Sequence, residues 1–167
     1  MSIQDFYAAA QAKEFARDFQ FRVRVLGPFT EDDLLYITTT TLPGKQIVNQ
    51  QVPFMGLQFN IPGSVQYTSS DAWQMTFRSD EGLNIRNKLE NWIKEIFDDE
   101  SSTGKYGTPV EEATMDLLGK NLEPIRRYNF IGIYPVSLGA TTYNIEGAGT
   151  PVTFDATFAY QYYRLIG

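Results

Sequence analysis

Alternating apolar and polar residues predict β-strands over much of the chain. Segments 19–27 (FQFRVRVLG) and 72–79 (AWQMTFRS) both show the two-residue period of a half-buried strand. The final run, 152–164, shows this period over the greatest length. The side chains expected to face the core are Phe19, Phe21, Val23 and Val25 in the first strand, Trp73, Met75 and Phe77 in the second, and Phe154, Ala156, Phe158, Tyr160 and Tyr162 in the last.

Three further segments are predicted to be strands, and the first of them is rich in β-branched and aromatic residues. They are LLYITTTTLPG (34–44), ATMDLL (113–118) and PIRRYNFIGIY (124–134). The first is expected to stop at Pro43-Gly44, and turn-forming residues follow the second at 119–121. The third is expected to end at Pro135, since proline cannot donate a hydrogen bond within a sheet.

The period changes to that of an amphipathic helix over about 81–97. Ser79 or Asp80 is expected to cap the helix start, and the turn-rich segment that begins at Asp98 is expected to be a loop. The apolar positions at helical spacing are Ile85, Leu89, Trp92, Ile93 and Ile96. Trp73 and Trp92 lie on the apolar faces of their elements, so we predict that both anchor the core.

Many strands with one inserted helix predict a mainly β fold. We expect an antiparallel β-sandwich or barrel, with the amphipathic helix packed on its side. No internal repeat or linker divides the sequence, so residues 1–167 are expected to form a single domain.

One segment, about 43–63, does not fit a simple core strand. Its only formal charge is Lys45, and prolines and glycines interrupt its many apolar residues. We expect a hairpin or an extended arm, which either folds over its own core or completes its burial on a neighbouring subunit. The candidate intersubunit residues are Leu42, Pro43, Val52, Phe54, Met55, Leu57 and Phe59.

Composition excludes several kinds of chemistry. The chain has no cysteine and no histidine, so disulfides, thiolate zinc sites, Ser-His-Asp triads and HExxH sites are ruled out. The acidic run 98–100 lacks the spacing of a calcium loop. We therefore expect no cofactor, no metal and no enzymatic activity.

The balance of charge also limits the partners. Net charge is −6, from 14 basic and 20 acidic side chains, which argues against a surface that grips phosphate backbones. Arg126-Arg127, beside Tyr128 and Phe130, resembles a basic and aromatic nucleic-acid platform, but the overall acidity favours an ordinary strand. No stretch is apolar enough for a transmembrane helix, and the start, MSIQDFYAAAQAKEF, lacks the basic leader of a signal peptide. We expect the monomer to remain in the cytoplasm without inserting into a membrane.

The order and spacing of several motifs resemble those of tail tube proteins from contractile-tailed, T-even-like bacteriophages. The resemblance covers most of the chain and is weakest at 98–112. The motifs that carry it are Leu42-Pro43 after a threonine-rich strand, Val52-Pro53-Phe54-Met55, Pro62-Gly63, Trp73, Asp80-Glu81, then Arg86, Lys88 and Trp92 in the helix, and IGIYPVSLG at 131–139.

The resemblance implies a structural role in a virion. Six subunits would form a ring, and rings would stack into a hollow tube that conducts double-stranded DNA during ejection. A sheath would surround the tube, a tape-measure protein would fill its lumen before ejection, and baseplate and tail-terminator proteins would contact its ends. Assembly would take place in the host cytoplasm.

A DNA conduit should not bind DNA, so the acidic balance fits this role. Asp116 and Asp155 are the candidate lumen-facing residues, because each sits at a solvent-facing position of a predicted strand. Either Arg126 or Arg127 would then point at DNA, and we expect a nearby carboxylate to neutralise it or the pair to lie at a subunit interface.

Other functions stay open at this point. The same fold would serve the tube of a type VI secretion system or of a phage-like bacteriocin. A monomeric β-barrel binding module would bury the arm in itself and enclose an apolar pocket. A hydrolase with two carboxylates would hold one carboxyl group with a raised pKa.

Overall fold

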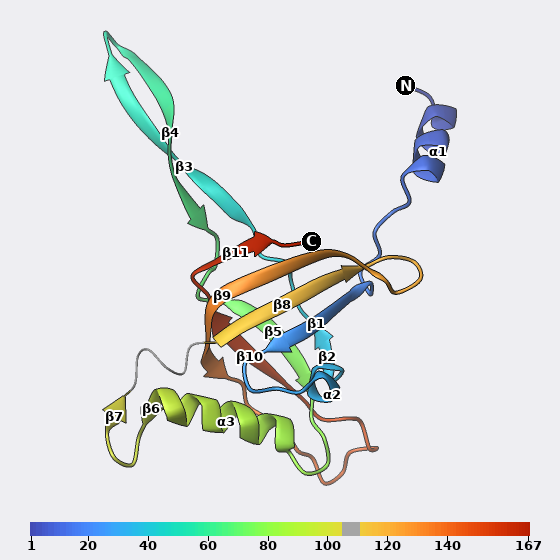
Figure 1. The fold of residues 1–167 in the computed structure, drawn as a ribbon, viewed down its shortest axis with the longest axis vertical. Coiled ribbons are helices and arrows are strands. Elements are labelled where there is room, and N and C mark those ends of the chain that lie inside the picture. The colour runs from blue at the N-terminus through green and yellow to red at the C-terminus, as the bar shows by residue number, and fades with distance from the viewer. Residues whose placement is uncertain (105–110) are drawn as a thin grey trace.

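The computed structural model describes residues 1–104 and 111–167. Most strands form one antiparallel sheet in the order β1-β8-β9-β10-β5-β2, and β11 also pairs with β9. The sheet curls around a core, with helix α3 packed beneath it (Figure 1). This mainly β architecture confirms the predicted fold class. The bounds are β1 Phe21–Leu26, β2 Ile37–Thr39, β5 Trp73–Arg78, β8 Glu111–Leu118, β9 Pro124–Leu138, β10 Thr153–Ala159, β11 Tyr162–Leu165 and α3 Asn84–Ile96.

The remaining elements lie outside this sheet. Strands β3, Lys45–Phe54, and β4, Leu57–Tyr67, form a long hairpin that projects from the body, and helix α1, Ile3–Ala12, projects separately (Figure 1). Helix α2, Glu31–Leu34, includes the first residue of the predicted strand 34–44, and only β2 of that segment is a strand. A small hairpin of β6, Phe97–Asp98, and β7, Thr103–Gly104, follows α3. The predicted loop that begins at Asp98 continues beyond β7 into residues 105–110, which lie outside the described residues.

Stacked aromatic rings fill the core. The rings of Trp73 and Phe130 lie 4.0 Å apart between centroids, and those of Phe77 and Phe154 lie 5.4 Å apart. Trp73 and Trp92 are both buried, which confirms that they anchor the core. Gly27 has φ +51°, and a Cβ there would lie 2.6 Å from the Trp92 ring, so only glycine fits where the chain leaves β1.

Helix α3 begins at Asn84, later than the sequence pattern predicts. Leu83 holds the N-cap position in a left-handed conformation and makes no side-chain capping bond. The Ser79 hydroxyl is buried without a partner among the described residues, so it does not cap the helix. Asp80 does accept a hydrogen bond from the Ile85 amide, at 3.4 Å, although it lies outside the N-cap position.

Strand β9 runs through Pro135, contrary to the predicted stop. The register of β10 against β9 shifts between Thr157 and Phe158, where Phe158 faces Pro135. A bulge of this kind tolerates proline inside a sheet. Because β9 continues, it pairs first with β11 and then with β10.

Irregular pairing also changes which side chains face the core. A register shift between Val23 and Val25 leaves Val25 exposed and buries Leu26. The final run breaks between β10 and β11, so Tyr163 is buried in place of the predicted Tyr162. Phe19 is exposed as well, because it precedes β1.

Two tyrosines of the core differ in their hydrogen bonding. The Tyr163 hydroxyl donates to the Pro43 carbonyl at 2.8 Å, whereas the buried Tyr160 hydroxyl has no partner among the described residues. Burial, with the neighbouring Tyr163 and Tyr67, raises the pKa of Tyr160 to about 12.

We expect Tyr160→Phe to stabilise the fold by about 1 kcal/mol, since it removes an unpaired buried hydroxyl. The matched variant Tyr163→Phe should cost about 1 kcal/mol, because the same change there removes a hydrogen bond. Urea unfolding of the monomer measures both. Equal effects of the two variants would contradict the different roles of these hydroxyls.

Candidate intersubunit surfaces

The hairpin β3–β4 is the largest exposed apolar feature of the described residues. It turns at Met55-Gly56, with φ values of +48° and +82°. Positive φ at both central residues is the signature of a tight turn whose twist matches that of the strands. The segment predicted as an arm is thus an ordered two-stranded ribbon, longer than the predicted 43–63.

Pairing across the hairpin separates its two faces. Val52 faces Phe59, Phe54 faces Leu57, and Gln50 faces Ile61, so these side chains share one face. Between them, Gln51 faces Asn60 on the other face. The apolar side chains are 44–63% exposed. A ribbon of two strands has marginal stability alone in water, and this one carries an uncovered apolar face.

The candidate arm residues therefore divide into two groups. Val52, Phe54, Met55, Leu57 and Phe59 lie in the outer part of the hairpin, and Met55 at the turn is 91% exposed. Leu42 and Pro43 instead precede β3, at the hairpin's root.

Hydrogen bonds fix the root of the hairpin to the core. Trp73 donates from Nε1 to the Thr41 carbonyl at 2.8 Å, next to the bond from Tyr163 to Pro43. The Thr68 amide donates to the Gly44 carbonyl at 3.2 Å, which closes the root. The Lys45 ammonium lies 5.4 Å from the centre of the Tyr163 ring. The direction of the hairpin is thus set by buried aromatic residues, although its tip is largely exposed.

Helix α1 is a second exposed apolar surface, which the sequence analysis missed. Ser2 caps it reciprocally with Asp5, through bonds of 2.9 and 3.2 Å. Ile3, Phe6 and Tyr7 are each at least 63% exposed, and the helix contains no buried residue. The capping pattern S-x-x-D, followed by apolar residues at helical spacing, was the signal that could have revealed it.

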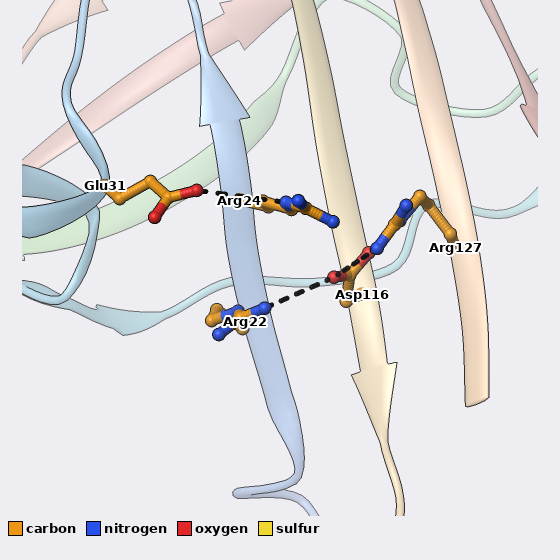
Figure 2. A network of polar contacts seen from close by, with 5 residues as sticks. All are labelled: Arg22, Arg24, Glu31, Asp116 and Arg127. Atoms are coloured by element: carbon orange, nitrogen blue, oxygen red, sulfur yellow. Dashed lines mark hydrogen bonds and ion pairs between the residues drawn. The ribbon is translucent and has the colours of Figure 1, made fainter. Parts of the chain in front are cut away.

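Asp116 is the one charged side chain buried among the described residues. Its carboxylate accepts from Arg127 at 2.8 and 3.3 Å, and Arg22 approaches it at 3.7 Å from β1 (Figure 2). The hydrogen bonds and charge of Asp116 raise the pKa of the Arg127 guanidinium. The solvent-facing position predicted for Asp116 is wrong, because arginines from both adjacent strands cover it. Asp116 thus pairs with Arg127, one of the two neighbouring arginines. That either arginine points into a lumen stays a prediction.

Asp155 keeps the exposed position that the alternation predicts. It lies on β10 and accepts a hydrogen bond from Thr76 of β5 at 2.7 Å. Asp116 and Asp155 are on different parts of the sheet and do not form one site. Whether either faces a lumen stays a prediction.

The described residues do not bring together the parts of a metal or hydrolytic site. They contain no group of three candidate metal ligands. Their carboxyl groups with a clear pKa shift, Asp5, Asp33 and Asp98, all shift downward. A carboxylate-pair hydrolase would need the opposite shift. None of the described helices is long and apolar enough to cross a membrane.

Comparison with solved structures shows the fold. A chain of the anti-feeding prophage baseplate superposes with a TM-score of 0.66 at 12% identity, covering 93% of this chain and 97% of that one. A chain of the anti-feeding prophage cap gives 0.66 at 16% identity, covering 92% of each. A chain of an extracellular contractile injection system sheath–tube complex gives 0.59 at 14% identity, covering 100% and 99%.

Comparison of the sequence with protein families identifies the family of the chain. No curated protein sequence matches the chain. The family model for phage tail tube proteins matches residues 6–166, which is nearly the whole chain. The protein therefore belongs to the phage tail tube protein family and is a structural subunit of a tail tube.

Proposed function

We propose that six copies of this chain close into a ring and that rings stack into the hollow tube of a contractile tail. The observation that carries the proposal is the hairpin β3–β4, with one apolar face uncovered by its own chain. Burying apolar surface stabilises by about 25 cal/mol per Å², so contact with a neighbour would strongly favour assembly. The residues of this uncovered apolar face are Val52, Phe54, Leu57, Phe59 and Ile61.

The ends of the sheet support ring closure. Strands β1 and β2 terminate the strand order, so each has one edge unpaired within the sheet. Open edges pair readily with other chains, and closure of subunits into a continuous inner barrel would satisfy them. The role is structural and non-enzymatic.

We further propose that the tube conducts double-stranded DNA and that assembly occurs in the host cytoplasm. A sheath would surround it, a tape-measure protein would occupy its lumen, and baseplate and terminator proteins would contact its ends. The net charge of −6 supports passage without retention, because a wall of like charge does not hold phosphates.

Electron microscopy of the purified protein tests assembly. We expect rings with six subunits and open-ended rods of stacked rings in negative stain. A chain that stays monomeric by light scattering at high concentration, with and without a baseplate to nucleate it, would overturn the proposal.

The proposal that Asp155 faces the lumen can be tested by substitution. In particles that carry Asp155→Lys, tubes should form normally, but DNA release should slow and become dependent on salt, since a ring of lysines would attract phosphates. Asp155→Asn is the control that removes the acid without adding a cation. Release rates measured at two salt concentrations give the result, and unchanged release from intact Asp155→Lys tubes would exclude Asp155 from the lumen wall.

A further inference from the structure

The four methionines of the chain differ sharply in their exposure to solvent. Met75 and Met115 are buried in the core, whereas Met55 is 91% exposed. Met1, at the start of the chain, is exposed as well. The chain has no cysteine, so these four thioethers hold its only sulfur atoms. Met55 is therefore the one exposed sulfur that lies within the folded part of the chain.

The backbone makes methionine an unexpected residue at this position. Met55 is the first central residue of the hairpin turn, with φ +48°, and Gly56 follows with φ +82°. Such turns favour asparagine, aspartate or glycine, because the Cβ of other residues lies too close to the following carbonyl oxygen. Strained residues cluster at functional sites. Since Met55 is exposed and adds nothing to the core, we look for its use outside its own subunit.

Met55 stands at the apex of the uncovered apolar face of the hairpin β3–β4. Phe54 and Leu57 face each other on either side of the turn, and both are more than half exposed. The side chain of methionine is flexible and polarizable, so it conforms to the irregular surface of a partner. In the proposed tube a neighbouring subunit covers this apex, and the sulfur is then open to solvent only before assembly.

We propose that Met55 is an oxidation site through which a peroxide controls assembly. The inference rests on the proposed tube and assigns a modification to its hairpin. A lone pair of the Met55 sulfur attacks one oxygen of hydrogen peroxide, and the O–O bond breaks. An S–O bond forms, the sulfur loses two electrons, and the second oxygen leaves as water after it takes the proton of the first. Methionine sulfoxide reductases reverse the change, and two thiols then become a disulfide while the oxygen leaves as water.

Oxidation changes the hairpin tip without unfolding the subunit. Water satisfies the polar sulfoxide oxygen in the free subunit, but an apolar contact with a neighbour leaves this oxygen without a hydrogen-bond donor. No core contact is lost, because Met55 is exposed, and the buried Met75 and Met115 are shielded from the oxidant. The modification therefore acts on assembly alone: oxidised subunits stay folded and unassembled until they are reduced.

Partial oxidation of the wild-type subunit tests the proposal without any substitution. Hydrogen peroxide is added until about half of Met55 is sulfoxide and is then removed. Rods are grown and separated from free subunits by sedimentation, and mass spectrometry of peptides measures the sulfoxide at Met55 in both fractions. We expect the ratio of sulfoxide to methionine at this position to be at least tenfold lower in rods than in free subunits.

The matched control is Met55→Leu, which keeps an apolar side chain of similar volume but has no sulfur at this position. We call the lowest protein concentration that gives rods in electron microscopy the critical concentration. That of Met55→Leu should equal the wild-type value and should not change with peroxide. Fully oxidised wild-type protein should need at least tenfold more protein, and reductases for both sulfoxide epimers, supplied with a thiol, should restore the original value. Circular dichroism should be the same before and after oxidation.

Rods that hold Met55 sulfoxide in the same proportion as the free subunits would overturn this inference and leave the proposed tube standing. The inference would also fail if peroxide raised the critical concentration of Met55→Leu as much as that of the wild type, because the sensitive group would then lie elsewhere. Loss of the folded circular dichroism spectrum on oxidation would overturn it too, since the effect would be on folding. Absence of rods from unoxidised wild-type protein would overturn the proposed tube itself, and the inference with it.

Discussion

Replacing Phe54 and Met55 together by aspartate should abolish tube growth while the monomer stays folded. Both side chains lie at the hairpin tip, where they are 63% and 91% exposed. Their loss removes no packing from the core, so we expect the free energy of unfolding to change by no more than about 0.5 kcal/mol. Two added charges per subunit would instead have to be desolvated in the intersubunit contact, which is costly. Rods should be undetectable at tenfold the wild-type critical concentration.

The control places the same charges on the other face of the hairpin. Gln51→Asp with Gln58→Asp adds two aspartates to polar positions, and it should reduce assembly much less than the tip variant does. Microscopy and urea unfolding are performed on all three proteins. Normal tubes from the tip variant, or the loss of its cooperative unfolding transition, would contradict the assignment of the apolar face to a neighbouring subunit.

A large effect on folding is expected at Asp116. Asp116→Lys should destabilise the monomer by about 3–5 kcal/mol, because it replaces a fully buried carboxylate by a third cation between Arg22 and Arg127. Asp155→Lys makes the same chemical change at an exposed site and should cost no more than about 0.5 kcal/mol. Urea unfolding compares the two. Similar stabilities would show that the arginines move away and leave position 116 open to water.

The sequence was most informative where strands are regular. Trp73, Met75 and Phe77 alternate and are buried as predicted, because β5 pairs without interruption along β10. Helix α3 was also predictable, since Ile85, Leu89 and Trp92 repeat at helical spacing around the core. Its start was missed because the left-handed conformation of Leu83 follows from the preceding turn and not from a capping residue.

Errors arose where pairing partners decide the outcome. The register shift in β1 and the break between β10 and β11 change which side chain points inward, so Val25 and Tyr162 could not be placed by alternation alone. The alternation of apolar and polar residues places Asp116 at a polar position of its strand. Its burial, however, depends on Arg22 and Arg127, which lie 94 and 11 residues away along the chain. Helix α1 was missed for a different reason: it does not pack against the core, and core-facing periodicity was the principal signal sought.

The two prolines of the hairpin have a consequence for the subunit before it assembles. Pro53 lies on β3 and Pro62 on β4, so each strand lacks one backbone donor. Proline is accommodated in a strand where its nitrogen faces away from the paired neighbour, which places these gaps on the outer edges of the ribbon. An added strand from a stray chain would find an incomplete hydrogen-bonding ladder on either side. The ribbon can therefore offer its apolar face to a proper neighbour while resisting amyloid-like growth along its edges, which would keep newly synthesised subunits from precipitating.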